Sequence, residues 1–330
     1  MIAAAALLGY AACAAWLAPA LLAPLTRRGL SVRAGLAAWL AAMASVLVSA
    51  VTGLQFAIRA VAADWPQLTQ DLCRSVAGSA CTPQVYDSTL YQAAVAALTF
   101  LLTVAAGVAL FRYGRRVQRS RTQTQAHARA ALLVGEGIPD TFAAAPGRAR
   151  TVMLVDPRPA AYCAAGRPAA IVVTSGALAV LDPAQLRAVL AHEHAHLAHG
   201  HHSLTAATRA LAAACRGVPL FTRGAAEVAR LAEMSADDTA ARFSGRPAVA
   251  TALLALATGR AIPGSLPAAC AGTGPLPRTA LAAAGDAVPA RVDRLLAPSR
   301  PGAARAVAVL LAAMSALLVA GPAVLTAFAQ

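Results

Sequence analysis

The sequence has 330 residues, of which 58% are hydrophobic and only 13% are charged. A water-soluble domain of this size cannot hide so much apolar surface, so the composition excludes an ordinary soluble protein and favours a membrane protein. All 28 basic residues are arginines, which crowd where apolar segments end and form no stripe with interleaved aromatics, so we expect no direct nucleic-acid binding.

Four apolar stretches are long enough to cross a lipid bilayer as helices, because about 20 apolar residues span the hydrocarbon core. None of the four contains a charged residue. No basic residue precedes the first one, so we interpret it as a retained span and not as a cleaved signal peptide. The predicted spans are residues 2–25, 34–58, 93–111 and 306–329.

Arginine also predicts how the spans are oriented, since cytosolic loops of membrane proteins carry the positive charge. Three arginines lie between the first two spans, and six follow the third span with no acid among them. We therefore expect a multi-pass protein of the bacterial plasma membrane with both termini outside. The chain divides into three spans with an outer loop at 59–92 (residues 1–111), a cytosolic domain (112–303) and a fourth span (304–330).

The expected outer loop contains two of the six cysteines, Cys73 and Cys81. A disulfide persists only in such an oxidising compartment, so these two are a candidate pair, and the sequence leaves open whether they bond. The other four cysteines lack C-x-x-C metal spacing, and we interpret them as buried or inert thiols.

The cytosolic segment starts with a basic polar linker up to about Arg129. Two β-branched runs follow, Thr151–Val155 and Ile171–Thr174, which predict a strand pair in a small antiparallel sheet. Asp182, Pro183 and Gln185 then give a helix start, namely an N-cap, a proline in the first turn and a capping-box partner. This helix should end at about residue 199. Two further helices are expected at 203–219 and 225–243, and a loop at 262–290. The apolar segments 203–215 and 248–257 are too short or too interrupted by charge to span a bilayer, which leaves two locations open, against the membrane or in the domain core, and we favour the core.

The capped helix carries the pattern H-E-x-x-H at residues 192–196. Residues four apart share a helix face, so the imidazoles of His192 and His196 can converge on one zinc ion. Glu193 points beside the metal, where its carboxylate can accept a proton from an activated water molecule. An accidental histidine-rich metal tract is the alternative. The capped helix and the acidic helix downstream favour a catalytic site.

A catalytic zinc site needs a third protein ligand, and two residues compete for that role. His202 has the spacing of H-E-x-x-H-x-x-G-x-x-H, but the glycine position of that pattern holds His199. Glu233 lies downstream on a predicted helix face that it shares with Asp237, whose carboxylate can orient a ligand imidazole. We favour Glu233. The alternative is that these acids form a solvated helix face.

These residues resemble the membrane zinc metallopeptidases that have a downstream E-x-x-A-D helix. That group contains the HtpX-type heat-shock proteases, the CAAX prenyl proteases and the BlaR/MecR antibiotic sensor-transducers. Three spans before the zinc helix and one after it resemble the BlaR/MecR arrangement, whereas HtpX-type chains usually place two on each side. The resemblance covers roughly residues 150–296 and rests on Ala161–Gly166, the strand before Ser175-Gly176, the zinc helix, Glu233–Asp237 and Arg291–Leu295.

The resemblance implies a mainly α membrane protein with four transmembrane helices and a cytosolic α+β gluzincin-like zinc metallopeptidase domain. It implies one zinc ion bound by His192, His196 and Glu233, with Glu193 as the general base and Asp237 as an orienting residue. It also implies that the strand at 170–174 aligns a substrate by edge pairing.

Two features depart from these relatives. The chain contains no lysine, which excludes β-lactam sensing by a lysine-activated serine, as in the antibiotic sensors. The histidine element of the heat-shock relatives is replaced by Ala287-Val288-Pro289. The group that stabilises the oxyanion therefore stays open, with Tyr162 and Arg291 as candidates.

Together, these patterns predict a signal-regulated zinc endopeptidase that acts on a cytosolic or membrane-proximal protein. By analogy, a BlaI-like transcriptional repressor is the first substrate to consider. Two alternatives remain, an HtpX-like quality-control protease and a non-catalytic zinc-binding membrane sensor. No pattern in the sequence indicates the activating signal or the oligomeric state.

Overall fold

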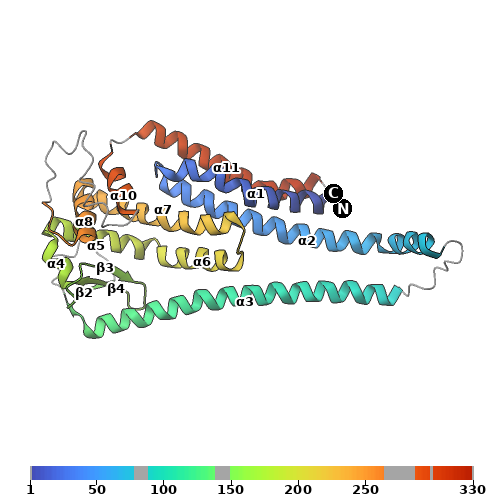
Figure 1. The fold of residues 1–330 in the computed structure, drawn as a ribbon, viewed down its shortest axis with the longest axis horizontal. Coiled ribbons are helices and arrows are strands. Elements are labelled where there is room, and N and C mark those ends of the chain that lie inside the picture. The colour runs from blue at the N-terminus through green and yellow to red at the C-terminus, as the bar shows by residue number, and fades with distance from the viewer. Residues whose placement is uncertain (1, 78–87, 138–148, 264–286, 298–299, 329–330) are drawn as a thin grey trace.

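The structure is a computed structural model dominated by long helices (Figure 1). It describes residues 2–77, 88–137, 149–263, 287–297 and 300–328. The long helices are α1 (Ile2–Arg27), α2 (Val32–Ala77), α3 (Ser88–Val134) and α11 (Pro301–Phe328). The others are α4 (Ser175–Val180), α5 (Pro183–Ala198), α6 (His201–Ala214), α7 (Pro219–Ser244), α8 (Arg246–Thr258) and α10 (Ala287–Leu296).

Three helices in the described part of the chain are long and apolar enough to cross a membrane, which indicates a membrane-associated protein. They coincide with the first, second and fourth predicted spans and comprise Ile2–Arg27, Val32–Ala63 and Pro301–Ala327. The third predicted span, 93–111, lies on α3, where several side chains are outside the described residues. The full set of four spans therefore stays a prediction.

Helix α2 continues well beyond the predicted end of its span at residue 58 and stops at Ala77. A charged residue ends an apolar stretch without ending a helix, so the segment that we expected to be a loop from residue 59 is helical as far as 77. Cys81 lies outside the described residues, and the candidate disulfide with Cys73 is therefore not tested.

Helix α7 connects the apolar helices to the domain that carries the H-E-x-x-H sequence. Its Leu220 and Leu231 are buried in one core with Leu22 of α1 and Trp39 of α2. A Cβ atom at Gly224 would overlap the end of the Met43 side chain and lie 3.1 Å from the Trp39 ring, so a glycine lets α7 pack closely on α2. The domain is therefore packed directly against the apolar bundle, as Figure 1 shows for α1, α2 and α7.

The sheet has four strands in the order β1-β2-β4-β3 and is mixed. Its strands are β1 (Glu136–Gly137), β2 (Arg150–Leu154), β3 (Ala161–Ala164) and β4 (Ala170–Thr174). The predicted pair, β2 and β4, forms, but it is parallel, so the prediction of an antiparallel sheet was wrong. Between the two strands the chain makes β3, which pairs antiparallel with β4 and thereby sets β4 in the same direction as β2.

This strand order changes which strand is available to a substrate. β4 lies between β2 and β3, so the expectation that residues 170–174 offer a free edge was wrong. Within the described sheet, the outer strand next to β4 is β3, which has one edge without a strand partner. β3 was hard to predict, because Ala161-Tyr162-Cys163-Ala164 contains no β-branched residue.

Helix α5 begins as its sequence predicts. The carboxylate of Asp182 accepts hydrogen bonds from the backbone N–H groups of Ala184 and Gln185, and the Gln185 side chain accepts one from the Asp182 N–H. The helix ends at Ala198, and Gly200 adopts a left-handed conformation with φ of +64° before α6 starts. This turn positions the histidines of the helix end.

The downstream helices begin earlier than expected. α6 begins at His201. α7 begins at Pro219, because proline fits the first turn of a helix and Gly224 is accommodated inside the helix. α8 is buried against α5 and α10, as predicted for the segment 248–257. Most of the expected loop 262–290 lies outside the described residues.

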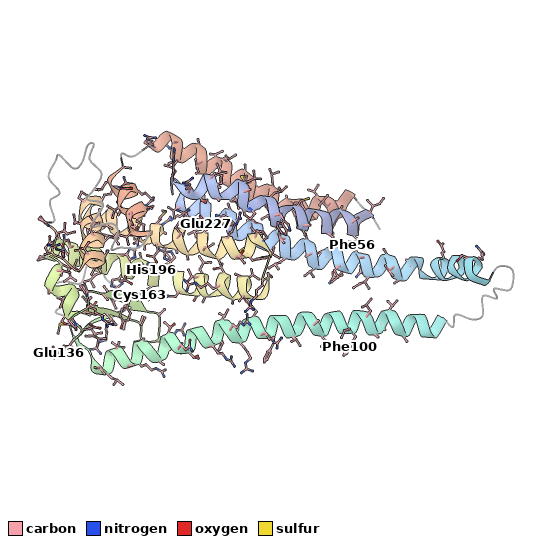
Figure 2. All side chains as sticks on the ribbon, in the orientation of Figure 1. Phe56, Phe100, Glu136, Cys163, His196 and Glu227 are labelled. Carbon is pink, nitrogen blue, oxygen red and sulfur yellow. The ribbon has the colours of Figure 1, made fainter. Side chains whose placement is uncertain are left out.

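Figure 2 shows Cys163 and His196 together where the strands meet the helices, far from Phe100 of α3.

Candidate metal centre

Helices α5 and α7 bring three potential metal ligands together. The Nε2 atoms of His192 and His196 are 3.1 Å apart. The carboxylate of Glu233 lies 3.5 Å from each, with Oε2 facing His192 and Oε1 facing His196. Their three ligand atoms all lie within 4.8 Å of one another. The structure thus joins a pair four residues apart to an acid on a different helix.

The donor set fits a zinc ion. Two imidazole nitrogens and one carboxylate oxygen are common zinc ligands, and ligand atoms of a tetrahedral zinc ion lie about 3.3–3.6 Å from one another. The two distances of 3.5 Å between Glu233 and the histidines fall in this range, and the distance of 3.1 Å between the histidines is slightly shorter. The His192 side chain is 11% exposed, whereas that of Glu233 is 43% exposed, so one side of the site is open to solvent. Three protein ligands leave the fourth position of a tetrahedral ion free for water, as in catalytic zinc sites.

His202, the competing third ligand, faces elsewhere. Its Nε2 atom lies 3.0 Å from the Sγ atom of Cys163 on β3, and its ring centre is 6.1 Å from that of His196. Burial, and next the charge of His196, lowers the pKa of His202. Burial, and next the charge of Glu193, raises the pKa of the Cys163 thiol well above its usual range. Both groups are therefore neutral near pH 7, and the geometry favours Glu233 as the third ligand.

Asp237 contacts the far side of the His192 ring. Its Oδ1 atom lies 3.1 Å from His192 Nδ1, which leaves Nε2 directed at Glu233 and His196. Burial opposes the charged form of His192, but the contacts with Asp237 and Glu233 outweigh it and raise its pKa to about 9. The carboxylate is therefore placed to orient the ring, the role that we expect for Asp237.

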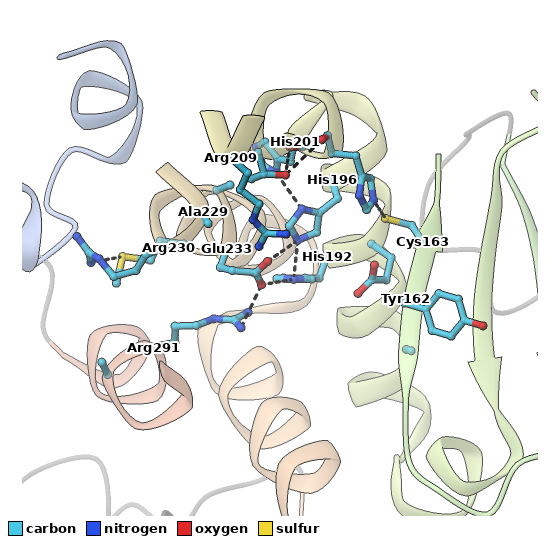
Figure 3. A pocket seen from close by; sticks show the side chains of 17 residues that line it. Tyr162, Cys163, His192, His196, His201, Arg209, Ala229, Arg230, Glu233 and Arg291 are labelled. Atoms are coloured by element: carbon cyan, nitrogen blue, oxygen red, sulfur yellow. Dashed lines mark hydrogen bonds and ion pairs between the residues drawn. The ribbon is translucent and has the colours of Figure 1, made fainter. Parts of the chain in front are cut away.

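Arg291 of α10 contacts both carboxylates, and Figure 3 shows it next to Glu233. Its Nε and Nη2 atoms donate to the two oxygens of Asp237 at 2.8 and 2.6 Å, and Nη1 lies 3.2 Å from Glu233 Oε2. Burial opposes ionisation of both acids, but contacts with His192 and Arg291 keep the pKa of Glu233 and of Asp237 below their usual ranges. Both acids are therefore negatively charged near pH 7.

His201, which sequence reasoning missed, occupies the corresponding place behind His196. The Nδ1 atoms of the two rings are 3.0 Å apart, and His201 is buried. Burial, and next the charges of His196 and His199, lowers the pKa of His201 to about 4. A neutral His201 can accept a hydrogen bond from His196 Nδ1, which leaves His196 Nε2 free to bind a metal. In the sequence, the spacing of five residues between His196 and His201 was the only feature that could have indicated this contact.

We therefore expect His201→Ala to weaken zinc binding by about 10–100-fold, the usual effect of losing such a supporting partner. The measurement is competition for zinc with a chromophoric chelator. His201→Asn should restore much of the affinity, because its amide oxygen accepts the same hydrogen bond. His199→Ala is the matched control, since His199 is exposed. Equal affinities for the two alanine variants would remove His201 from the site.

The three ligands line a cavity of about 700 Å³ between β3, α5, α6, α7 and α10. Glu193 lines this cavity next to His192. A smaller cavity of about 210 Å³ adjoins it, sharing His192, Glu193, Glu233 and Arg291 and walled by aliphatic residues that include Val249 and Leu253. The arrangement offers room for an extended chain and a small pocket for an apolar side chain.

Both oxyanion candidates from the sequence, Tyr162 and Arg291, belong to residues that line the larger cavity, but each has other contacts. Arg291 is already bonded to Asp237 and Glu233. Tyr162 belongs to the opposite face of the sheet from Cys163, because successive side chains of a strand alternate, and it packs with Val172. Figure 3 shows its ring extending away from the histidines toward which Cys163 points. Arg209 of α6, which also lines the larger cavity, was not considered from the sequence.

Comparison with protein families found one match, between residues 120–226 and the model of Peptidase family M48. The matched stretch contains His192, Glu193 and His196 and ends before Glu233. It supports a metallopeptidase, and M48 peptidases are zinc enzymes. Comparison with curated proteins and with solved structures found no match.

Proposed function

We propose that the protein is a membrane-anchored zinc endopeptidase. The observation that carries this proposal is the convergence of His192, His196 and Glu233 beside Glu193, in a cavity large enough for an extended peptide. The match to a peptidase family over the zinc helix supports the same reaction class. Among related enzymes, the BlaR/MecR-like and HtpX-like types both remain compatible with this site.

The residues have distinct roles in the proposed reaction. A bound zinc ion would polarise the peptide carbonyl and lower the pKa of water. Glu193 accepts the proton of the attacking water and delivers it to the leaving amine. Asp237 and His201 hold the rings of His192 and His196, and Arg291 holds the Glu233 carboxylate. The ligand geometry is therefore set before a substrate arrives.

The substrate is proposed to bind as an extended strand on the open edge of β3. Ala161 and Cys163 of this strand line the metal cavity, so a peptide paired with β3 passes the site in a fixed register. The adjoining aliphatic cavity would hold one of its apolar side chains. This assignment replaces the edge expected from residues 170–174.

The biological role that we favour is regulated proteolysis of a cytosolic or membrane-proximal protein. Helix α7 carries Glu233 and also packs in the core of the apolar bundle. A change in the packing of the bundle would therefore shift the helix that carries Glu233. A BlaI-like repressor is the first substrate to test, by analogy. Release of a single repressor fragment in cells supports this role, whereas degradation of many membrane proteins indicates quality control.

Metal removal tests the reaction class. A chelator should abolish cleavage of a casein or peptide substrate by the purified full-length protein, and stoichiometric zinc should restore it. Magnesium should not restore activity, because it prefers six oxygen ligands. If cleavage persists in the metal-free protein, zinc takes no part in it. If the zinc-loaded protein cleaves nothing, the non-catalytic zinc sensor becomes the better assignment.

A further inference from the structure

A second large cavity, of about 730 Å³, lies where the apolar helices meet the metal-site domain, and we call it the junction cavity. Its walls come from the end of α1 and the turn after it, from α7, α8 and α10, and from the first turn of α11. Met234 and Ala290 line both this cavity and the metal cavity. The two cavities are therefore neighbours, although the junction cavity contains none of the metal ligands.

The junction cavity is strongly positive. Five arginines and two aspartates line it, and the arginines are Arg27, Arg28, Arg246, Arg294 and Arg300. Arg246 donates to the backbone oxygen of Ala297, and Arg294 pairs with Asp238. In the described part of the chain, no ion pair is seen for the other three arginines. Guanidinium groups remain charged at any physiological pH, so the cavity favours an anion.

Arg294 has a buried donor that a bound anion would satisfy. Its Nη2 atom donates to Asp238 at 2.6 Å and its Nε atom to the Gly29 carbonyl at 3.1 Å. Its Nη1 atom is buried and has no hydrogen-bond partner among the described residues. Leaving a charged donor unpaired inside a protein is unfavourable. An oxygen atom of a ligand in the junction cavity would remove this cost.

The turn at Gly29 brings the backbone close to Arg294. Gly29 adopts φ of +57°, and a Cβ atom there would lie 2.7 Å from Arg294 Nε. Only glycine combines this backbone conformation with so close an approach. The backbone turn between α1 and α2 therefore packs directly against the guanidinium group of Arg294 on α10.

The position of the cavity indicates what kind of anion it meets. α1 ends at Arg27 and α11 begins at Pro301, so the cavity is level with the ends of two candidate spans, where lipid headgroups lie. The first turn of α11 adds the partial positive charge of a helix N-terminus. Leu21 of α1 and Val309 of α11, both largely exposed, provide apolar surface for acyl chains nearby.

We propose that the junction cavity binds the phosphate headgroup of an anionic membrane lipid, of the phosphatidylglycerol class. Free phosphate has the same recognition chemistry, but it lacks the acyl chains that would contact the exposed apolar helix faces. The proposal does not depend on the peptidase function, because it rests on residues outside the metal centre.

Binding can be measured by native mass spectrometry of the full-length protein in detergent micelles, titrated with phosphatidylglycerol or with phosphatidylcholine. Phosphatidylglycerol should bind preferentially. The double variant Arg28→Gln with Arg300→Gln should lower its affinity about 30-fold, since each arginine near a headgroup contributes roughly fivefold. Arg28→Lys with Arg300→Lys should retain most of the affinity, because the charge remains.

The matched control is Arg112→Gln with Arg119→Gln, two exposed arginines on α3 that do not line the junction cavity. This pair should leave the affinity unchanged. Equal losses of affinity in the two glutamine variants would mean that the lipid is attracted by surface charge in general, which would overturn the proposal. Unchanged affinity in both variants would also overturn it. Displacement of the lipid by an equal concentration of inorganic phosphate would overturn the assignment to a lipid.

Discussion

Glu193→Gln is expected to abolish peptide cleavage while leaving the zinc content of the protein unchanged. Glutamine has the size of glutamate but cannot accept the proton of the attacking water, and a positioned general base contributes about 10²–10⁴-fold to such reactions. Glu193 lines the metal cavity but is not among the three grouped ligands, so its replacement should not disturb the metal. The measurements are the cleavage rate of a quenched fluorescent peptide and the zinc content of the same sample.

The matched control for that substitution is Glu136→Gln, which changes an exposed glutamate at the edge of the sheet, away from the site (Figure 2). This variant should retain full activity. A Glu193→Gln protein that cleaves as fast as the unaltered protein would eliminate Glu193 as the general base. Loss of zinc from that variant would instead assign Glu193 a structural role.

Glu233→Ala is expected to remove zinc from the site. Loss of a partner that only supports a ligand costs about 10–100-fold in metal affinity, so the loss of a direct ligand should cost at least about 100-fold. Arg291 keeps its two hydrogen bonds to Asp237, so the fold around the site should persist. Zinc content after dialysis against a weak chelator gives the affinity, and circular dichroism reports the fold.

Two further substitutions make the Glu233 result specific. Asp238→Ala removes a neighbouring acid that pairs with Arg294 and not with the histidines, so its zinc affinity should stay unchanged. His202→Ala removes the competing ligand, whose Nε2 atom faces Cys163. If zinc survives in Glu233→Ala but is lost in His202→Ala, the third ligand is His202 and the assignment of Glu233 is wrong.

Local features of the sequence predicted the part of the site that one helix carries. The capping box at Asp182 and Gln185 predicted where α5 starts, and helical spacing predicted that His192 and His196 share a face. Apolar length likewise predicted three helices that are able to cross a membrane. Each of these features depends on neighbours within a turn or on composition within one segment.

Contacts between segments that are distant in the sequence were harder to predict. Helical spacing shows that Glu233 and Asp237 share a face of α7, but only the packing of α5 on α7 places that face against His192. The bidentate contact of Arg291 with Asp237 joins residues 54 positions apart, so no local pattern could indicate it. The parallel pairing of β2 with β4 was missed because the intervening strand has a weak β signal.

The most direct test of the metal centre is the position of the metal itself. X-ray diffraction from crystals of the purified protein, recorded on both sides of the zinc absorption edge, should give one anomalous peak about 2.0–2.2 Å from His192 Nε2, His196 Nε2 and a Glu233 oxygen. A peak held by His201 or His202 in place of Glu233, or no zinc peak at all in active protein, would contradict this ligand set.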